Sequence, residues 1–374
     1  MIRKAKIMTI YYSTYAIMIF FAIISKSITQ NNKARNRFIC IINFIMLFGI
    51  LALRHWSVGN DLGFRLKYNV GYIPSFQAIN THSWSEVLKM ESFLNYEKGY
   101  VIFNKLVGSV YNNKQFFLAV CAFIDFISIA ILIYEKSKLP LLSWMIFLGL
   151  PVFLIFFSGL RQGIAISIIV LSVKFIDEKK IIKFILTVLL ASTFHKSAIV
   201  FFIAYPLYHV KISGWKSILS ILIIPIVFVL RQPLFSIFSK IFKDDAHTRD
   251  NGSWLLFVLF CVIYIALTIL NHYNRTKNNK FLNLFYFACL CQAFSGIYTT
   301  AMRVGYYFMI FLIIALPNAV YELKNNTART SENEFILGYI TVFAAFVVYG
   351  IYALSTSTWG CTNPYYFFWQ SVIG

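Results

Sequence analysis

Residues 116–134 read FFLAVCAFIDFISIAILIY, and this run decides the fold class. Asp125 is its one Asp, Glu, Lys or Arg residue, and lysines flank the run at positions 114, 136 and 138. A helix of about 20 apolar residues crosses the hydrocarbon core of a bilayer, which is roughly 30 Å thick. The run therefore predicts a membrane-spanning helix.

Similar apolar runs recur along the whole chain. Of its 374 residues, 59% are hydrophobic, 18% are aromatic and only 13% are charged, which makes it more apolar than a soluble domain of this length. Short charged clusters separate the runs, so we predict an all-α polytopic integral membrane protein with about 11 membrane segments, forming a single membrane domain over residues 1–374. The expected segments are 8–26, 37–53, 115–134, 140–157, 160–176, 182–208, 215–230, 253–271, 281–298, 303–321 and 335–354.

The formal net charge of +20 reflects basic residues that lie beside these apolar runs. Membrane orientation explains such residues, because cytoplasmic loops carry an excess of lysine and arginine. The chain has no basic domain interleaved with aromatic residues, so we expect no nucleic-acid partner. The six cysteines lie mostly inside apolar runs without metal-ligand spacing, and we expect neither disulfides nor a bound metal.

The run 182–208 is too long for one ordinary span and carries FHKS, residues 194–197, at its centre. A charge is most unfavourable there, so we expect two half-helices that meet at a polar break around His195. This break places Lys180 and Lys211 on the same, cytoplasmic side, in agreement with the charge bias of the loops, although the basic N-terminal tail is an exception.

With this topology, the two long loops 54–114 and 231–252 are external. In the first loop, residues 83–94 have the spacing of an amphipathic helix at the membrane interface.

The first candidate cluster, RHWSVGND at residues 54–61, follows the second span, and Tyr68 lies further along the same loop. Arg54 could hold a phosphate with its bidentate fork, and Gly59 could let the backbone approach a ligand closely. Asp61 is a candidate general base, which a salt bridge to Arg54 would keep ionised. The alternative is an interfacial arginine that extends along the membrane surface beside Trp56.

The second cluster is SGLRQG, residues 158–163, a turn between two spans with almost no loop. An arginine so close to hydrocarbon is unfavourable unless an anion accompanies it, and the positive-inside rule does not explain a turn that lies outside. Arg161, next to Gln162, is thus a candidate anion-binding residue. Arg303 repeats the pattern at the mouth of a later span.

Three further ionisable side chains are candidates for proton transfer or binding. His195 can exchange a proton near neutral pH, although a lone buried histidine is usually only hydrogen-bonded. Glu97 adds an acid to the external loop. Asp125 lies in the middle of a span, where it is either functional or a protonated acid that bonds a neighbouring helix.

Four sequence blocks together resemble the EpsG family of polysaccharide polymerases, which is similar in role to the Wzy polymerases. They occur in the family's order, on a matching hydropathy profile, and cover most of the chain. Asn60 stands where the family often has threonine, whereas the following Asp61 matches. The blocks are 54–61 with Tyr68, YEKGY at 96–100, LRQGIA at 160–165 and FHKSA at 194–198.

The resemblance implies a glycosyltransferase of the bacterial cytoplasmic (inner) membrane, with its active site on the outer face. Such an enzyme joins undecaprenyl-diphosphate-linked oligosaccharide repeat units into O-antigen, capsule or exopolysaccharide. Its surroundings would include the lipid bilayer, a flippase and a chain-length regulator. Arginines would neutralise the leaving diphosphate, so we expect a metal-independent enzyme without a cofactor.

The expected catalytic residues are His195 or Asp61 as the base, and Arg161. Two alternatives stay open: a glycan ligase of similar architecture, and a flippase or transporter of lipid-linked oligosaccharide. A flippase should display basic groups along a path through the membrane, whereas here they gather at one mouth, which favours an enzyme. The expected substrate-binding residues are Arg54, Arg303, Gly59, Gln162, Tyr68 and Glu97.

Overall fold

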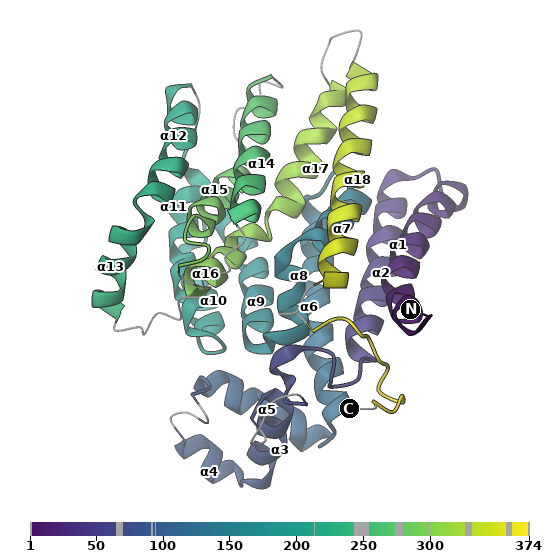
Figure 1. Ribbon diagram of the computed structural model, residues 1–374, viewed down its shortest axis with the longest axis vertical. Helices are drawn as coiled ribbons and strands as arrows, with labels where there is room; N and C mark the ends of the chain where they lie inside the picture. Colours follow the sequence, from purple (N-terminus) through teal and green to yellow (C-terminus); the bar gives the residue numbers. More distant parts are fainter. Residues whose placement is uncertain are drawn as a thin grey trace. The chain divides into compact units, whose positions relative to one another are not determined.

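The computed structural model describes residues 2–64, 70–90, 93, 95–212, 214–242, 254–273, 280–297, 299–325, 331–356 and 361–372. Helices make up almost all of these ranges, together with two isolated β-bridges. The chain divides into two compact units, one of residues 1–199 and 341–374 and the other of residues 200–340. The predicted all-α polytopic fold is confirmed (Figure 1).

The first unit contains the N-terminal helices and the last part of the chain. Within it, α2 packs against α1, α6 and α7, and α9 packs against α6, α8 and α10. Its elements are α1 (Ile2–Ile28), α2 (Asn32–Ala52), η1 (Asn60–Leu62), α3 (Tyr72–Thr81), α4 (Trp84–Lys89), α5 (Lys98–Val110), α6 (Lys114–Lys136), α7 (Pro140–Gly149), α8 (Pro151–Ser158), α9 (Leu160–Asp177) and α10 (Ile181–Ser192).

The second unit is built around α15, which packs against five other helices of the unit. The 3₁₀ helix η3 (Lys196–Ile203) and the long helix α18 (Ser331–Thr356) each run from one unit into the other. The remaining elements are α11 (Ala204–His209), α12 (Trp215–Val229), α13 (Arg231–Phe242), α14 (Trp254–Tyr273), α15 (Lys280–Gln292), α16 (Thr299–Met309), α17 (Leu312–Glu322) and η4 (Leu323–Asn325).

Each of the eleven predicted segments coincides with one or more helices. Within the described residues, five helices are long and apolar enough to cross a membrane, and three pairs of shorter helices meet the same criterion if each bent pair is one span. The three remaining segments correspond to α9, α10 and α15. These helices are shorter or carry more charge, so the structure supports five to eight spans and the count of eleven stays a prediction.

Two of the predicted spans are broken in the first unit. The helices α7 and α8 meet at 68°, where the sequence analysis expected one continuous span over 140–157. Pro151 explains the bend, because proline lacks a backbone N–H and forces the preceding Leu150 into an extended conformation. The expected break in 182–208 is confirmed: α10 ends at Ser192, and a 3₁₀ helix begins at Lys196.

The long loop 54–114 folds into helices that gather beyond one end of α2 and α6 (Figure 1). The expected helix at 83–94 is shorter, comprising α4 alone, and begins with a capping box between Ser83 and Glu86. Its amphipathic character is confirmed, since Val87 is buried against Ile79 and Val101 while Trp84 faces outward. The second long loop, 231–252, begins with α13, and its residues from 243 lie outside the described ranges.

Candidate functional site

Glu97 joins two of the predicted site residues, Arg161 and His195. One carboxylate oxygen, Oε2, accepts a hydrogen bond of 2.5 Å from Nη1 of Arg161. The other oxygen, Oε1, lies 3.5 Å from Nδ1 of His195 and accepts the backbone N–H of Lys196 at 3.0 Å. Residues from three sequence blocks, which together span about a hundred positions, therefore meet at one carboxylate.

The backbone positions these three side chains. Glu97 is the N-cap of α5, Arg161 is the second residue of α9, and His195 lies in the turn between α10 and η3. The start of α5 lies against that turn because Gly99 has no side chain: a Cβ there would be 2.6 Å from Cβ of Thr193. The backbone N–H of Tyr100 donates to the carbonyl of Thr193 at 3.2 Å and fixes the contact.

The surroundings of Arg161 are aromatic and acidic. Its guanidinium carbon lies 4.5 Å from the centroid of the Tyr96 ring, and Tyr96 stacks on Tyr72. A cation at a helix N-terminus is opposed by the helix dipole, so the carboxylate of Glu97 stabilises this arginine. The anion that the sequence analysis required beside Arg161 is thus present within the chain, and 20% of the arginine side chain stays exposed to additional ligands.

Glu97 stays ionised over the whole physiological range. Burial opposes its charge, but the nearby His195 ring, the hydrogen bond from the backbone N–H of Lys196 and the charge of Arg161 outweigh burial and lower the pKa of Glu97 to about 2. A carboxylate next to Nδ1 favours the histidine tautomer that carries its proton on Nδ1. In that tautomer, Nε2 of His195 is the basic nitrogen.

Arg54 is buried, with only 1% of its surface exposed. Its Nη1 donates to the carbonyl of Phe156 at 3.3 Å, and its guanidinium lies 5.3 Å from the ring of Phe157. Burial lowers the pKa of Arg54 to about 10, which leaves it charged at neutral pH. The sequence analysis offered Asp61 as a salt-bridge partner, whereas within the described residues this guanidinium contacts the end of α8.

The C-terminal segment covers Arg54, which the sequence analysis did not anticipate. The backbone of Arg54 forms a β-bridge with Phe367, and the N–H of His55 donates to the carbonyl of Tyr366 at 2.7 Å. The hydroxyl of Tyr365 donates to the carbonyl of Ile50 at 2.7 Å. The aromatic run YYFFW at residues 365–369 is the only signal in the sequence that could have suggested such packing.

Gly59 and Asn60 attach the first candidate cluster, residues 54–61, to the second, residues 158–163. Gly59 has a φ of 125°, and a Cβ there would collide with the carbonyl of Phe157. The N–H of Asn60 donates to Oγ of Ser158 at 2.9 Å. Gly59 therefore allows two backbone segments to approach closely.

Asp61 lies in η1 and accepts a hydrogen bond of 3.3 Å from the side chain of Asn60. Burial raises the pKa of Tyr72 and of Tyr96, the two rings beside Arg161, and the charge of Asp61 adds to this rise. Asp61 is thus near the Glu97 cluster.

The other predicted residues lie elsewhere in the chain. Gln162 is buried with 3% exposure beneath the turn that carries Arg161. Asp125 is buried and accepts a hydrogen bond of 3.1 Å from Ser167 of α9, so it bonds a neighbouring helix. Arg303 lies in α16 of the second unit, and Tyr68 lies outside the described residues.

Comparison with known proteins gives one match. The sequence profile described as the EpsG family matches residues 37–367. Neither the curated proteins nor the solved structures give a match. Within the described ranges, no group of three or more His, Cys, Asp and Glu side chains is arranged to hold a metal ion.

Proposed function

Since the chain belongs to the EpsG family of membrane proteins with a polysaccharide polymerase-like role, we propose that it polymerises undecaprenyl-diphosphate-linked oligosaccharide repeat units. The reaction would take place on the outer face of the bacterial cytoplasmic membrane and would yield O-antigen, capsule or exopolysaccharide. The observation that carries this proposal is the carboxylate of Glu97, which holds an arginine and a histidine on its two oxygens.

In this proposal His195 is the general base. Its Nδ1 faces Glu97, so Nε2 is available to take the proton of the acceptor hydroxyl. The acceptor oxygen forms a bond to the anomeric carbon of the growing chain, and the bond from that carbon to the diphosphate breaks. The arrangement is similar in logic to a carboxylate that orients a histidine base in hydrolases.

Arg161 would neutralise the charge that develops on the leaving diphosphate. One Nη group already bonds Glu97, and the planar guanidinium has further N–H groups for phosphate oxygens. Electrostatic stabilisation of a leaving group by such donors makes a large contribution to catalysis in many enzymes. The partial exposure of Arg161 supports this role over the fully buried Arg54.

A reconstituted assay tests both the function and the role of Arg161. The purified protein in liposomes, given a lipid-linked repeat unit, is expected to produce a ladder of lipid-linked oligomers and to release undecaprenyl diphosphate. Arg161→Lys should lower the rate of oligomer formation by a hundredfold or more, because lysine keeps the charge but loses the planar fork.

The matched control is Arg231→Lys, which should keep near-normal activity. Arg231 also donates to a backbone carbonyl and lies over an aromatic ring, but it is not part of the Glu97 cluster. Translocation of the substrate without oligomers would indicate a flippase, and transfer to an acceptor that is not lipid-linked would indicate a ligase. Either result would refute the proposed polymerase.

A further inference from the structure

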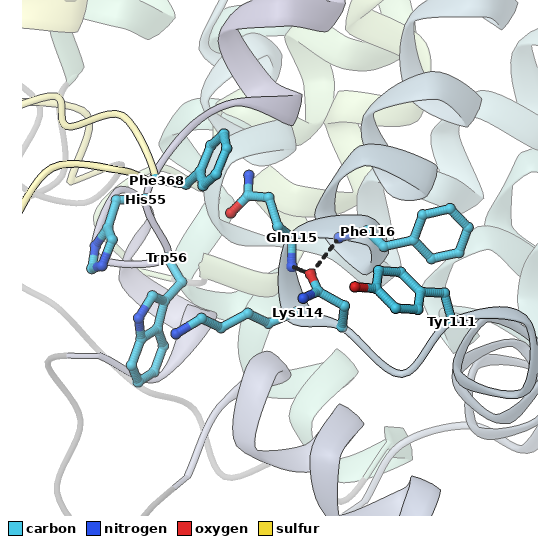
Figure 2. Close-up of a pocket in the computed structure, with 8 residues that line it drawn as sticks. His55, Trp56, Tyr111, Lys114, Gln115, Phe116 and Phe368 are labelled. Atoms are coloured by element: carbon cyan, nitrogen blue, oxygen red, sulfur yellow. Dashed lines mark hydrogen bonds between the residues drawn. The ribbon is translucent and has the colours of Figure 1, made fainter.

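A pocket of about 400 Å³ lies where α6 begins, apart from the Glu97 cluster. Its volume is in the range of small-ligand sites, which are roughly 300–1,000 Å³. Three parts of the first unit form it: the segment after α2, the start of α6 and the C-terminal segment. The lining residues are His55, Trp56, Tyr111, Asn113, Lys114, Gln115, Phe116 and Phe368 (Figure 2).

Aromatic rings form most of the wall of this pocket. Figure 2 shows Tyr111 beside Phe116, and their ring centroids are 5.7 Å apart. Tyr111 and Phe368 leave 59% and 45% of their surfaces exposed, so a ligand could cover them. Rings with free faces present apolar surface to the C–H groups of a sugar while the hydroxyls of the sugar stay in water.

Among the described residues that line the pocket, Lys114 carries the one positive charge, and none has a carboxylate. The ammonium of Lys114 lies 4.9 Å from the centroid of the Trp56 ring. Burial, followed by the charge of Lys114, lowers the pKa of His55, so this imidazole is neutral at neutral pH. The field of the α6 N-terminus has the same sign as Lys114, and both favour a negative ligand.

Two amide side chains of the lining, those of Asn113 and Gln115, form hydrogen bonds within the protein. The side chain of Asn113 accepts the backbone N–H groups of Gln115 and Phe116, at 2.8 and 3.1 Å. The amide of Gln115 donates to the carbonyls of Ala52 and Arg54. These bonds hold the pocket in shape and leave Lys114 as the group that can pair with an anion.

We propose that this pocket binds an acidic sugar residue of the lipid-linked glycan, with the carboxylate at Lys114 and the sugar ring against the aromatic wall. The proposal rests on the proposed function and specifies its substrate class as a repeat unit that contains a carboxylate. A lipid diphosphate fits less well, because it carries several charges and is best held by bidentate arginines, whereas one lysine matches one carboxylate.

The pocket is connected to the Glu97 cluster through a shared hydrophobic core. Trp56 and Phe116 pack on the same group of buried residues as Tyr96 and Phe194, which flank Glu97 and His195 in the sequence. This core can hold the two sites at a fixed separation. A sugar bound in the pocket would then set which hydroxyl or which anomeric carbon reaches His195.

The test is a saturation-transfer NMR titration of the full chain in lipid nanodiscs. The probes are methyl β-glucuronide, its neutral counterpart methyl β-glucoside, and inorganic pyrophosphate. The glucuronide should bind at least about tenfold more tightly than the glucoside, and Lys114→Gln should remove that difference. Lys114→Arg should keep it, and Tyr111→Ala should weaken both sugars.

Lys33→Gln is the matched control, because Lys33 is also an exposed lysine in the first turn of an asparagine-capped span but does not line the pocket. It should bind all probes as the unaltered protein does. Equal affinity for both sugars, or an unchanged glucuronide affinity in Lys114→Gln, would overturn the proposal. The proposal would also be overturned if pyrophosphate displaced the glucuronide and if its binding required Lys114. That result would identify a site for a lipid headgroup.

These measurements do not depend on polymerisation. Loss of the proposed function in the reconstituted assay, together with intact glucuronide binding here, would leave the pocket assignment in place. Normal polymerisation without glucuronide binding would refute the pocket alone.

Discussion

At the scale of single residues, the central observation is that Glu97 offsets two unfavourable features of this fold. It neutralises Arg161 at a helix N-terminus and satisfies a backbone N–H at the break before η3. Such a carboxylate could be purely structural. Its contact with Nδ1 of His195 is the feature that gives it a further use, because orienting an imidazole also defines which nitrogen is basic.

The identity of the base gives a prediction at this scale. His195→Gln should lower turnover by roughly a hundred- to ten-thousandfold, the usual contribution of a general base. A base must be unprotonated, so the rate should fall as pH falls, and His195→Gln should abolish this acidic limb. Glu97, whose pKa is about 2, is ionised throughout and does not produce the limb.

The comparison variant for this prediction is Asp61→Asn, measured by pH–rate profiles on purified enzyme with lipid-linked substrate. It should retain the acidic limb, because in this proposal the proton is taken by His195, whose Nδ1 faces Glu97. If Asp61→Asn is inactive and His195→Gln keeps near-normal turnover, the general base is Asp61 and not His195.

At the scale of elements, the site depends on how closely α5 approaches the turn after α10. Gly99→Ala should weaken this contact, since the added Cβ would be 2.6 Å from Cβ of Thr193. We expect a stability loss of about 1–3 kcal/mol, typical of overpacking, and a loss of activity in a protein that still inserts. Polymer length and the thermal midpoint in detergent measure the two effects.

Gly49→Ala is the control for this substitution, because a Cβ at Gly49 in α2 would meet nothing within 4 Å. It should be neutral or slightly stabilising, as expected when alanine replaces glycine inside a helix. If both variants behave alike, the close approach of α5 does not matter for the site.

At the scale of the whole molecule, the length of α10 bears on which side of the membrane each loop lies. The helix α10 has 12 residues and is about 18 Å long at 1.5 Å per residue, too short to cross roughly 30 Å of hydrocarbon. This length favours a chain that turns back after α10 over one that crosses here, so we predict that Lys180 and Lys211 are both cytoplasmic. His195, at the turn between them, is predicted to be accessible from the outer face. The charge bias of the loops supports the same arrangement.

Single-cysteine labelling from each side of the membrane checks this prediction. The background must first lose all six native cysteines, at positions 40, 121, 261, 289, 291 and 361, which form no disulfides within the described residues. Labels introduced at 180 and 211 should react only from the cytoplasmic side. Reaction of these two positions from opposite sides would show that the chain crosses the membrane between them.

The sequence by itself determined the all-α membrane fold and the break around His195, because both depend on local properties. Apolar length against a bilayer predicts helices, and a histidine and a lysine inside an overlong run predict an interruption. The sequence also identified Glu97, Arg161 and His195 as candidate site residues. Only the tertiary structure joined them, since a contact across 64 or 98 positions depends on which helices pack together and leaves no periodic signal in either segment.

Tertiary structure also determined contacts that the predictions did not include. Gly59 and Gly99 each allow two backbones to meet, and a glycine in the sequence does not reveal whether its neighbour will be a ligand or another segment. The burial of Arg54 beneath residues 361–370 depends on the two ends of the chain coming together. Long-range packing sets such contacts, so they became visible only in the folded molecule.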